Sequence, residues 1–169
     1  MITLLDGASK LGNVISKETK YLSNLVKDKN LTLIDRIESF EDIISIEVGD
    51  TALSRARNIE RELSMRQLYL KFEGGNTSGT QKDRIAFAQC LDALRRAYDT
   101  ITVSTCGNYG SSIALAANLA GLKCIIFIPE NYHTQRIAEM ENLGSEVRRL
   151  PGSYEDAVHH SSQEAARLE

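Results

Sequence analysis

The chain is poor in the residues that mark disulfide-rich, metal-binding and membrane proteins. Its 169 residues contain three cysteines, two prolines and no tryptophan. The cysteines, Cys90, Cys106 and Cys124, have spacings that fit neither a disulfide framework nor a zinc site, and the three histidines form no cluster, so we expect no metal. No apolar run approaches the roughly 20 residues of a membrane-spanning helix, so no membrane partner is expected.

Charge of one sign is not in excess either. The 20 basic and 23 acidic residues are mixed along the chain and leave a net charge of -3. Without a basic stripe, nucleic acid and anionic membranes are not indicated as partners. Residues 1–6 lack the pattern of a signal peptide, and we expect a cytoplasmic protein. With 42% hydrophobic and 25% charged residues, the composition is that of a soluble globular domain with its own core.

Strand-like and helical patterns alternate from residue 49 to the last residue. Strand-like runs occur at 68–73, 100–104, 124–128 and 146–150, and helical patterns at 82–98, 110–120, 134–143 and 153–168. Short connections between such units predict an α/β fold, a three-layer α/β/α domain with a mostly parallel sheet, over residues 49–169. The run 100–104 is β-branched and unbroken, as in a strand that is buried on both faces.

The first 48 residues have a weaker pattern and form an amino-terminal arm of uncertain structure. Apolar residues at 21–26 could form one face of a short helix, and 31–34 reads as a strand. We find no candidate site in this segment. It could be a lid, an arm on a neighbouring domain or an oligomer contact.

A turn after the run 68–73 places Lys82 near the start of a helix. Two glycines end the run, and Ser78, Thr80 and Asp83 then favour a helix start. The partial positive charge of a helix start disfavours an ammonium, and a neutral lysine is a nucleophile toward aldehydes. The common alternative is a solvated lysine in a first helical turn. A phosphate loop of the GxxxxGK[ST] type is excluded, because Thr80 stands where its lysine must be.

Three blocks in order resemble one enzyme family. LKFEGGNTSGTQKDRIA resembles the segment around the cofactor lysine in the tryptophan-synthase-β-like (fold type II) pyridoxal-phosphate enzymes, above all threonine synthases. GDTAL at 49–53 resembles their G-x-T-P-L motif, and 104–130 resembles their S-T-G-N-x-G segment. The resemblance covers most of this chain but only about the amino-terminal half of the family's architecture. It implies that the cofactor is pyridoxal 5′-phosphate and that Lys82 is the Schiff-base lysine.

The turn after the run 100–104 is a second candidate site. Thr105, Cys106, Gly107 and Asn108 lead into a helix whose first N–H groups have no internal partners, which suits a carboxylate or phosphate. The alternative is that Asn108 simply caps this helix. The resemblance implies that the loop binds the substrate α-carboxylate and that Asn108 hydrogen-bonds the pyridoxal ring hydroxyl. As turns that follow strands, this loop and the Lys82 turn are expected at one edge of the sheet.

The implied activity is a pyridoxal-phosphate-dependent lyase or synthase acting on a small amino acid by β- or γ-elimination or replacement. Several residues depart from the family pattern: Thr77 and Ala52 replace prolines, Cys106 replaces serine or threonine, and Gln81 replaces an aromatic residue. A branch related to threonine synthase, with another leaving group, is therefore as plausible as threonine synthase itself. A nucleotide-binding domain is disfavoured because no GxGxxG follows any strand.

The second candidate function is a non-catalytic one. The family's carboxyl-terminal domain holds a glycine-rich loop for the cofactor phosphate, and after Gly121 this sequence has only the isolated Gly144 and Gly152. The chain could therefore be a fragment, a truncated or degenerate half-domain that needs a separate carboxyl-terminal half to bind cofactor. Because such a half leaves apolar surface exposed, we expect a homo-oligomer or a complex with that separate half.

Overall fold

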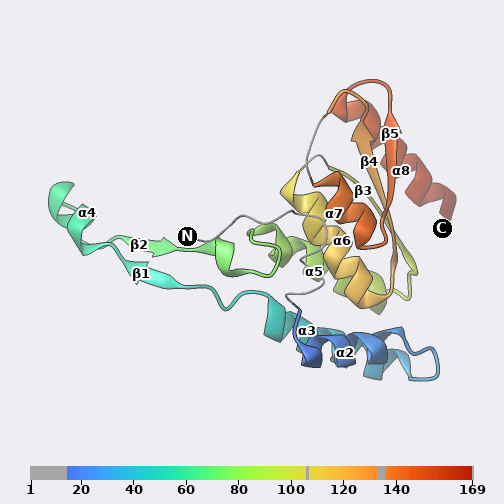
Figure 1. Ribbon diagram of the computed structural model, residues 1–169, viewed down its shortest axis with the longest axis horizontal. Helices are drawn as coiled ribbons and strands as arrows, with labels where there is room; N and C mark the ends of the chain where they lie inside the picture. Colours follow the sequence, from blue (N-terminus) through green and yellow to red (C-terminus); the bar gives the residue numbers. More distant parts are fainter. Residues whose placement is uncertain (1–14, 106, 133–135, 169) are drawn as a thin grey trace.

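A three-stranded parallel sheet with helices on both faces forms the body of the molecule (Figure 1). The computed structural model describes residues 15–105, 107–132 and 136–168. The sheet has the order β3-β4-β5, and all its neighbours are parallel. Its strands are β3 (Thr100–Ser104), β4 (Lys123–Pro129) and β5 (Glu146–Leu150), and its covering helices are α5 (Lys82–Arg95), α6 (Asn108–Ala120), α7 (Ile137–Asn142) and α8 (Tyr154–Leu168).

The central strand β4 divides the core into two parts. Cys124, Ile126 and Ile128 belong to the larger apolar cluster, on the side of α5, α6 and α7. Ile125 and Phe127 alternate with them and pack with Ala157 of α8 on the other face. This alternation confirms the predicted three-layer α/β/α arrangement with a parallel sheet. Gly121 ends α6 with a φ of 68°, a left-handed conformation that glycine adopts without strain.

Strand β3 lies at the edge of the sheet. Each of its five residues is half-buried, so the prediction of a strand buried on both faces was wrong. The β-branched pattern indicates that both faces of the strand are covered. The partial exposure of β3 arises because no strand in the described part of the chain pairs with its outer edge, and only the order of the strands reveals this. Helix α8 returns from β5 across the sheet to pack on β3 and β4.

Two helices lie in the described part of the amino-terminal segment, residues 15–48, and pack onto the body. They are α2 (Lys17–Lys27) and α3 (Leu33–Glu47). The strand predicted at 31–34 was wrong, because Thr32 and Asp35 form a reciprocal capping box that starts α3. Phe40 of α3 stacks on Phe87 of α5 with ring centroids 6.0 Å apart, and both side chains are fully buried.

A β-hairpin extension, residues 53–72, projects from the body (Figure 1). It pairs β1 (Leu53–Arg55) with β2 (Tyr69–Lys71) antiparallel, and α4 (Arg57–Glu62) lies between them. The predicted strand at 68–73 is thus real but was wrongly placed in the parallel sheet; its partner is β1. Both strands are exposed along their whole length, and the extension carries seven exposed large apolar side chains: Leu53, Ile59, Leu63, Met65, Tyr69, Leu70 and Phe72.

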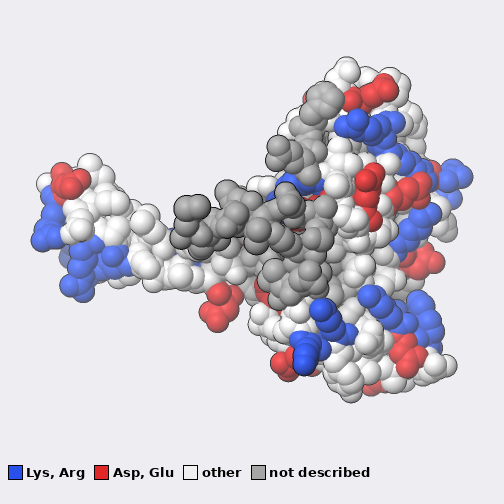
Figure 2. Space-filling view, viewed as in Figure 1, with Lys and Arg blue, Asp and Glu red and all other residues white. Residues whose placement is uncertain are grey.

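The tip of the hairpin extension carries basic side chains, which gather there in Figure 2. Glu60 organises this tip: its Oε1 accepts hydrogen bonds from Arg55 Nε and the backbone N–H of Leu68, each 2.8 Å long. Arg55 holds the pKa of the Glu60 carboxyl below its ordinary value. In the described part of the chain, no helix has the length and apolar character needed to cross a membrane.

Candidate active site

Lys82 is the first residue of α5, and its side chain is exposed. Its backbone N–H donates to Thr80 Oγ1 across 3.0 Å. Among residues 15–105, 107–132 and 136–168, the Lys82 ammonium has no hydrogen-bond or ion-pair partner. Lys82 therefore presents a primary amine to the surroundings from a backbone that is held in place.

The loop before Lys82 is fixed from inside the protein. Gly79 has a φ of 81°, which favours glycine there. The Asp83 carboxylate is fully buried; its Oδ2 accepts the backbone N–H of Ser78 across 2.7 Å and its Oδ1 contacts the Ser78 hydroxyl. These two contacts close the loop that precedes Lys82.

A second set of contacts joins the Lys82 loop to the GDTAL segment. Arg84 grips Glu73 with two bonds, Nε to Oε2 at 2.7 Å and Nη2 to Oε1 at 3.0 Å, and also donates to Gly49 O at 3.2 Å. Asn76 Oδ1 accepts the Gly49 N–H across 3.0 Å, and Asn76 Nδ2 donates to the carbonyls of Glu73 and Thr80. Hydrogen bonding from Arg84 lowers the pKa of Glu73 to about 2.

The amino-terminal helices also reach this loop. Thr77 Oγ1 lies 3.0 Å from the carbonyl oxygen of Glu47, at the end of α3, and contacts the Glu47 carboxylate. Glu47 Oε1 accepts a hydrogen bond of 2.5 Å from Thr19 Oγ1 of α2. A side-chain tether thus stands where the family pattern has a proline.

The second loop ends at the start of α6. The residue that caps this helix is Gly107, so the alternative that Asn108 is the cap was wrong: Asn108 is the first helical residue. Within the described part of the chain, no side chain caps the first N–H groups of α6, which suits an anion. Apart from its chain neighbours, no described residue has an atom within 4 Å of a Cβ built at Gly107, so these residues leave room for a ligand beside it. Thr105 is buried, and Cys106 lies outside the described residues.

The two loops come together, although β2 is not part of the sheet. Ser78 Oγ and Ser112 Oγ of α6 are 2.9 Å apart. Arg136 spans the same gap: Nη1 donates to Asn108 Oδ1 across 2.7 Å, and Nη2 donates to Ser78 O across 3.2 Å. The two loops therefore contact each other as expected, but the premise that both follow strands of one sheet was wrong, because β2 pairs with β1 outside that sheet.

Sequence reasoning missed Arg136. The signal was present, because Arg136 follows the carboxyl end of β4, which is the parallel neighbour of β3. The rule that parallel strands deliver their following loops to one edge applies to this connection as well. The hydrogen bonds of Arg84 with Glu73 and Thr51 were also missed, because the hairpin that brings these residues close depends on non-local strand pairing.

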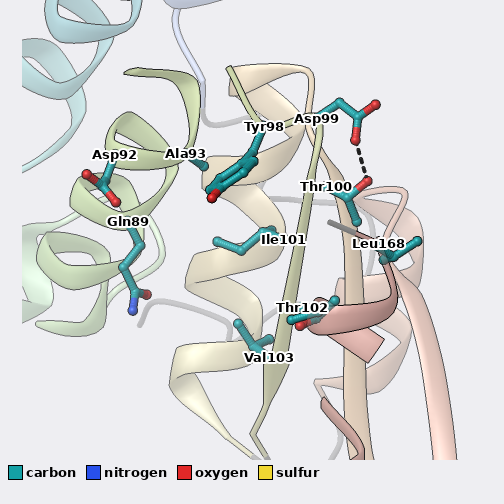
Figure 3. A pocket seen from close by; sticks show the side chains of 11 residues that line it. Gln89, Asp92, Ala93, Tyr98, Asp99, Thr100, Ile101, Thr102, Val103 and Leu168 are labelled. Carbon is teal, nitrogen blue, oxygen red and sulfur yellow. Dashed lines mark hydrogen bonds between the residues drawn. The ribbon is translucent and has the colours of Figure 1, made fainter. Parts of the chain in front are cut away.

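A separate groove of about 320 Å³ runs along the free edge of β3 (Figure 3). Its walls come from α5 and α8, with Gln89 on one side and Leu168 on the other, and Thr100 to Val103 form its floor. None of the residues from Gly74 to Lys82 lines it. The groove therefore belongs to the lateral edge of the sheet and not to the Lys82 site.

Comparison with known proteins places the chain in a family. The sequence model of the family described as "Pyridoxal-phosphate dependent enzyme" matches residues 44–169. The chain belongs to this family. The expected membership is thus confirmed, and so is the expected cofactor, pyridoxal 5′-phosphate, which the family description names.

Relatives and solved structures cover the same region. Threonine synthase of Methanocaldococcus jannaschii is 32% identical over 117 residues, 69% of this chain, and cystathionine beta-synthase of Oryctolagus cuniculus is 37% identical over 109 residues, 62% of this chain. The crystal structure of O-ureido-L-serine synthase aligns with a TM-score of 0.64 and 25% identity over 73% of this chain. The chain spans 29% and 20% of the two relatives' lengths and 40% of the solved chain.

Proposed function

We propose that this chain is the lysine-bearing part of a pyridoxal-phosphate-dependent amino-acid lyase or synthase, with Lys82 as the residue that holds the cofactor. The observation that carries the proposal is the contrast between Lys82 and its neighbours. Asp83 is fully buried and Arg84 grips Glu73, whereas the Lys82 amine is exposed and has no partner among the described residues. A nucleophilic amine needs this combination of a fixed backbone and a free side chain.

The residues fit the cofactor at two further points. The exposed Asn108 amide can hydrogen-bond the ring hydroxyl, and the uncapped start of α6, with Thr105, Cys106 and Gly107 before it, can bind the substrate α-carboxylate. The open space beside Gly107 admits such a group. When bound, the cofactor ring withdraws the electrons left on the substrate's α-carbon. Lys82 would attach to the cofactor's aldehyde carbon and, when released as a free amine, would take the α-proton on Nζ.

The reaction class we propose is β- or γ-elimination or replacement on a small amino acid, as in a threonine synthase. The similarity to a threonine synthase supports this class. The similarity to a cystathionine beta-synthase supports replacement at the β-carbon as the alternative within it. A second candidate is a half-domain without activity of its own, which needs a separate carboxyl-terminal half to bind the cofactor. The second candidate is kept because the matches cover only 29% and 20% of the two relatives' lengths.

The experiment that tests the proposal is labelling of Lys82. The purified chain is titrated with pyridoxal phosphate, reduced with borohydride and mapped by peptide mass spectrometry. We expect stoichiometric label at Lys82 that is lost in Lys82→Ala. Lys123→Ala is the matched control, because Lys123 is also exposed but is paired with Glu146 at the opposite end of the sheet. Label spread over many lysines and unchanged in Lys82→Ala would overturn the proposal for this chain alone and favour the second candidate.

The hairpin extension supports a macromolecular partner. A two-stranded hairpin is marginally stable in water by itself, and residues 53–72 expose seven large apolar side chains. We propose that the partner is the remainder of the family's architecture, which the relatives' greater length supplies, and that the extension packs against it. Light scattering of the purified chain tests for the rival partner, a second copy. A concentration-dependent dimer that Leu70→Glu abolishes would replace our proposal with self-association.

A further inference from the structure

Arg136 holds the amide of Asn108 in one orientation. The guanidinium lies between two loops, and the Arg136 side chain is 25% exposed. Its Nη1 donates to Asn108 Oδ1 across 2.7 Å, while Nη2 reaches the carbonyl oxygen of Ser78. Both donors belong to one planar guanidinium, so Arg136 fixes the position of Asn108 relative to the loop that precedes Lys82.

The chemistry of the pair fixes which end of the amide faces Arg136. A guanidinium only donates hydrogen bonds, so it selects the amide oxygen and turns the NH₂ group the other way. Without such a partner the two ends of an asparagine amide are nearly isosteric and exchange at little cost. The Asn108 side chain is exposed, and its Nδ2 has no acceptor in the described part of the chain, so both of its N–H donors are available to a ligand.

The guanidinium is itself held on its other side. Glu139 Oε2 accepts Arg136 Nε across 2.7 Å, and it also accepts Ser111 Oγ of α6 across 2.8 Å. Glu139 is 8% exposed, so its charge is matched by Arg136 within the protein. This chain of contacts, from Ser111 through Glu139 to Arg136, leaves the guanidinium little freedom to turn away from Asn108.

We propose that Arg136 is a positioning residue that keeps the Asn108 N–H donors directed at the ring hydroxyl of pyridoxal phosphate. The proposal rests on the proposed role of Asn108 in cofactor binding. An oxygen acceptor can be bound only by the NH₂ end of the amide, and a flipped amide would present a second oxygen to it and repel it. Arg136 therefore acts on cofactor affinity without contacting the cofactor.

The first test needs no cofactor. The ¹³Cγ resonance of Asn108 reports whether its oxygen accepts a charged hydrogen bond. We expect this resonance to move upfield in Arg136→Gln, whose amide can pair with either end of Asn108, and to stay near the wild-type position in Arg136→Lys, whose ammonium can only donate. Arg96→Gln is the matched control, because Arg96, at the carboxyl end of α5, is 62% exposed and pairs with the equally exposed Asp92. An Asn108 resonance that is unchanged in Arg136→Gln would overturn the proposal.

The second test asks whether Arg136 acts through Asn108. Pyridoxal phosphate is titrated against Arg136→Gln, Asn108→Ala and the double variant, with Lys82 labelling as a separate readout. Loss of one well-placed hydrogen bond predicts an affinity about tenfold lower in each single variant. We expect no further loss in the double variant and undiminished labelling of Lys82 at saturating cofactor. Equal losses that add in the double variant would assign Arg136 a general structural role instead.

The two tests separate this inference from the proposed function. If the wild-type chain takes no cofactor at Lys82, the proposed function fails for this chain alone, while the Asn108 resonance still decides the orientation. Thermal unfolding of each variant identifies a folding defect. If Arg136→Gln does not fold, Arg136→Lys and Arg136→Met carry the comparison, with the shift expected only in Arg136→Met.

Discussion

Asp83 Oδ2 accepts the backbone N–H of Ser78 across 2.7 Å, and this bond closes the loop that carries Lys82. Because Asp83 is fully buried, an asparagine there puts an NH₂ group in place of one carboxylate oxygen, and one of the two Ser78 donors loses its acceptor. We expect Asp83→Asn to lower the free energy of unfolding by about 1–3 kcal/mol, measured by urea denaturation. Asp92→Asn on the same helix is the control, since Asp92 is 62% exposed, and it should change stability by less than about 0.5 kcal/mol. Equal effects of the two substitutions would remove this role from Asp83.

The ion pair of Glu73 with Arg84 makes the Lys82 loop sensitive to acid. The pKa of Glu73 is lowered from 4.5 to about 2, mainly by hydrogen bonding from Arg84. A lowered folded-state pKa gives stability that is present above 4.5 and is lost as the pH falls toward 2. We expect Glu73→Gln to be less stable than wild type at neutral pH and to approach it near pH 2. Parallel stability curves for the two proteins between these limits would contradict the assignment.

The stacked pair Phe40 and Phe87 joins α3 to α5. Both rings are fully buried, so truncation leaves a cavity between the amino-terminal helices and the body. We expect Phe87→Ala to cost about 3–5 kcal/mol of unfolding free energy, and the double variant with Phe40→Ala to cost less than the sum of the two. Phe72→Ala, whose ring is 66% exposed on the hairpin extension, is the control and should cost much less.

Two cysteines are protected by burial. Burial raises the pKa of Cys124 to about 11 and also raises that of Cys90, and the thiolate is the form that alkylates. We expect iodoacetamide at pH 8 to modify neither residue in the folded protein and both in urea. Peptide mass spectrometry measures this. Rapid modification of either residue in the native protein would mean that α5 or β4 opens readily.

The patterns within single segments predicted much of the fold. The continuous apolar run of β4 predicted a buried strand, and Gly121 predicted the end of α6. Each of these two predictions depends only on residues close in the sequence or on the burial of apolar side chains. The position of Lys82 at the start of α5 was predicted in the same way, from two glycines and the polar residues after them.

The predictions failed mainly where the structure depends on contacts between residues far apart in the sequence. The segment 31–34 is apolar enough for a strand, yet one reciprocal bond pair between Thr32 and Asp35 commits it to helix. The run 68–73 alternates like a sheet strand, and nothing within it reveals that β1 is its partner. Arg136 lies 28 residues from Asn108, and only the parallel pairing of β3 with β4 brings their loops to one edge.

The contact between Thr77 and Glu47 restrains the loop before Lys82 in a different way from a proline. A proline restricts the backbone before folding begins, because its ring limits the unfolded chain as well. The Thr77 hydroxyl exerts no such restraint in the unfolded chain, and its bond forms only when the end of α3 has docked. The restraint that Thr77 places on the loop before Lys82 is thus present only in the folded protein, and temperature and solvent can loosen it.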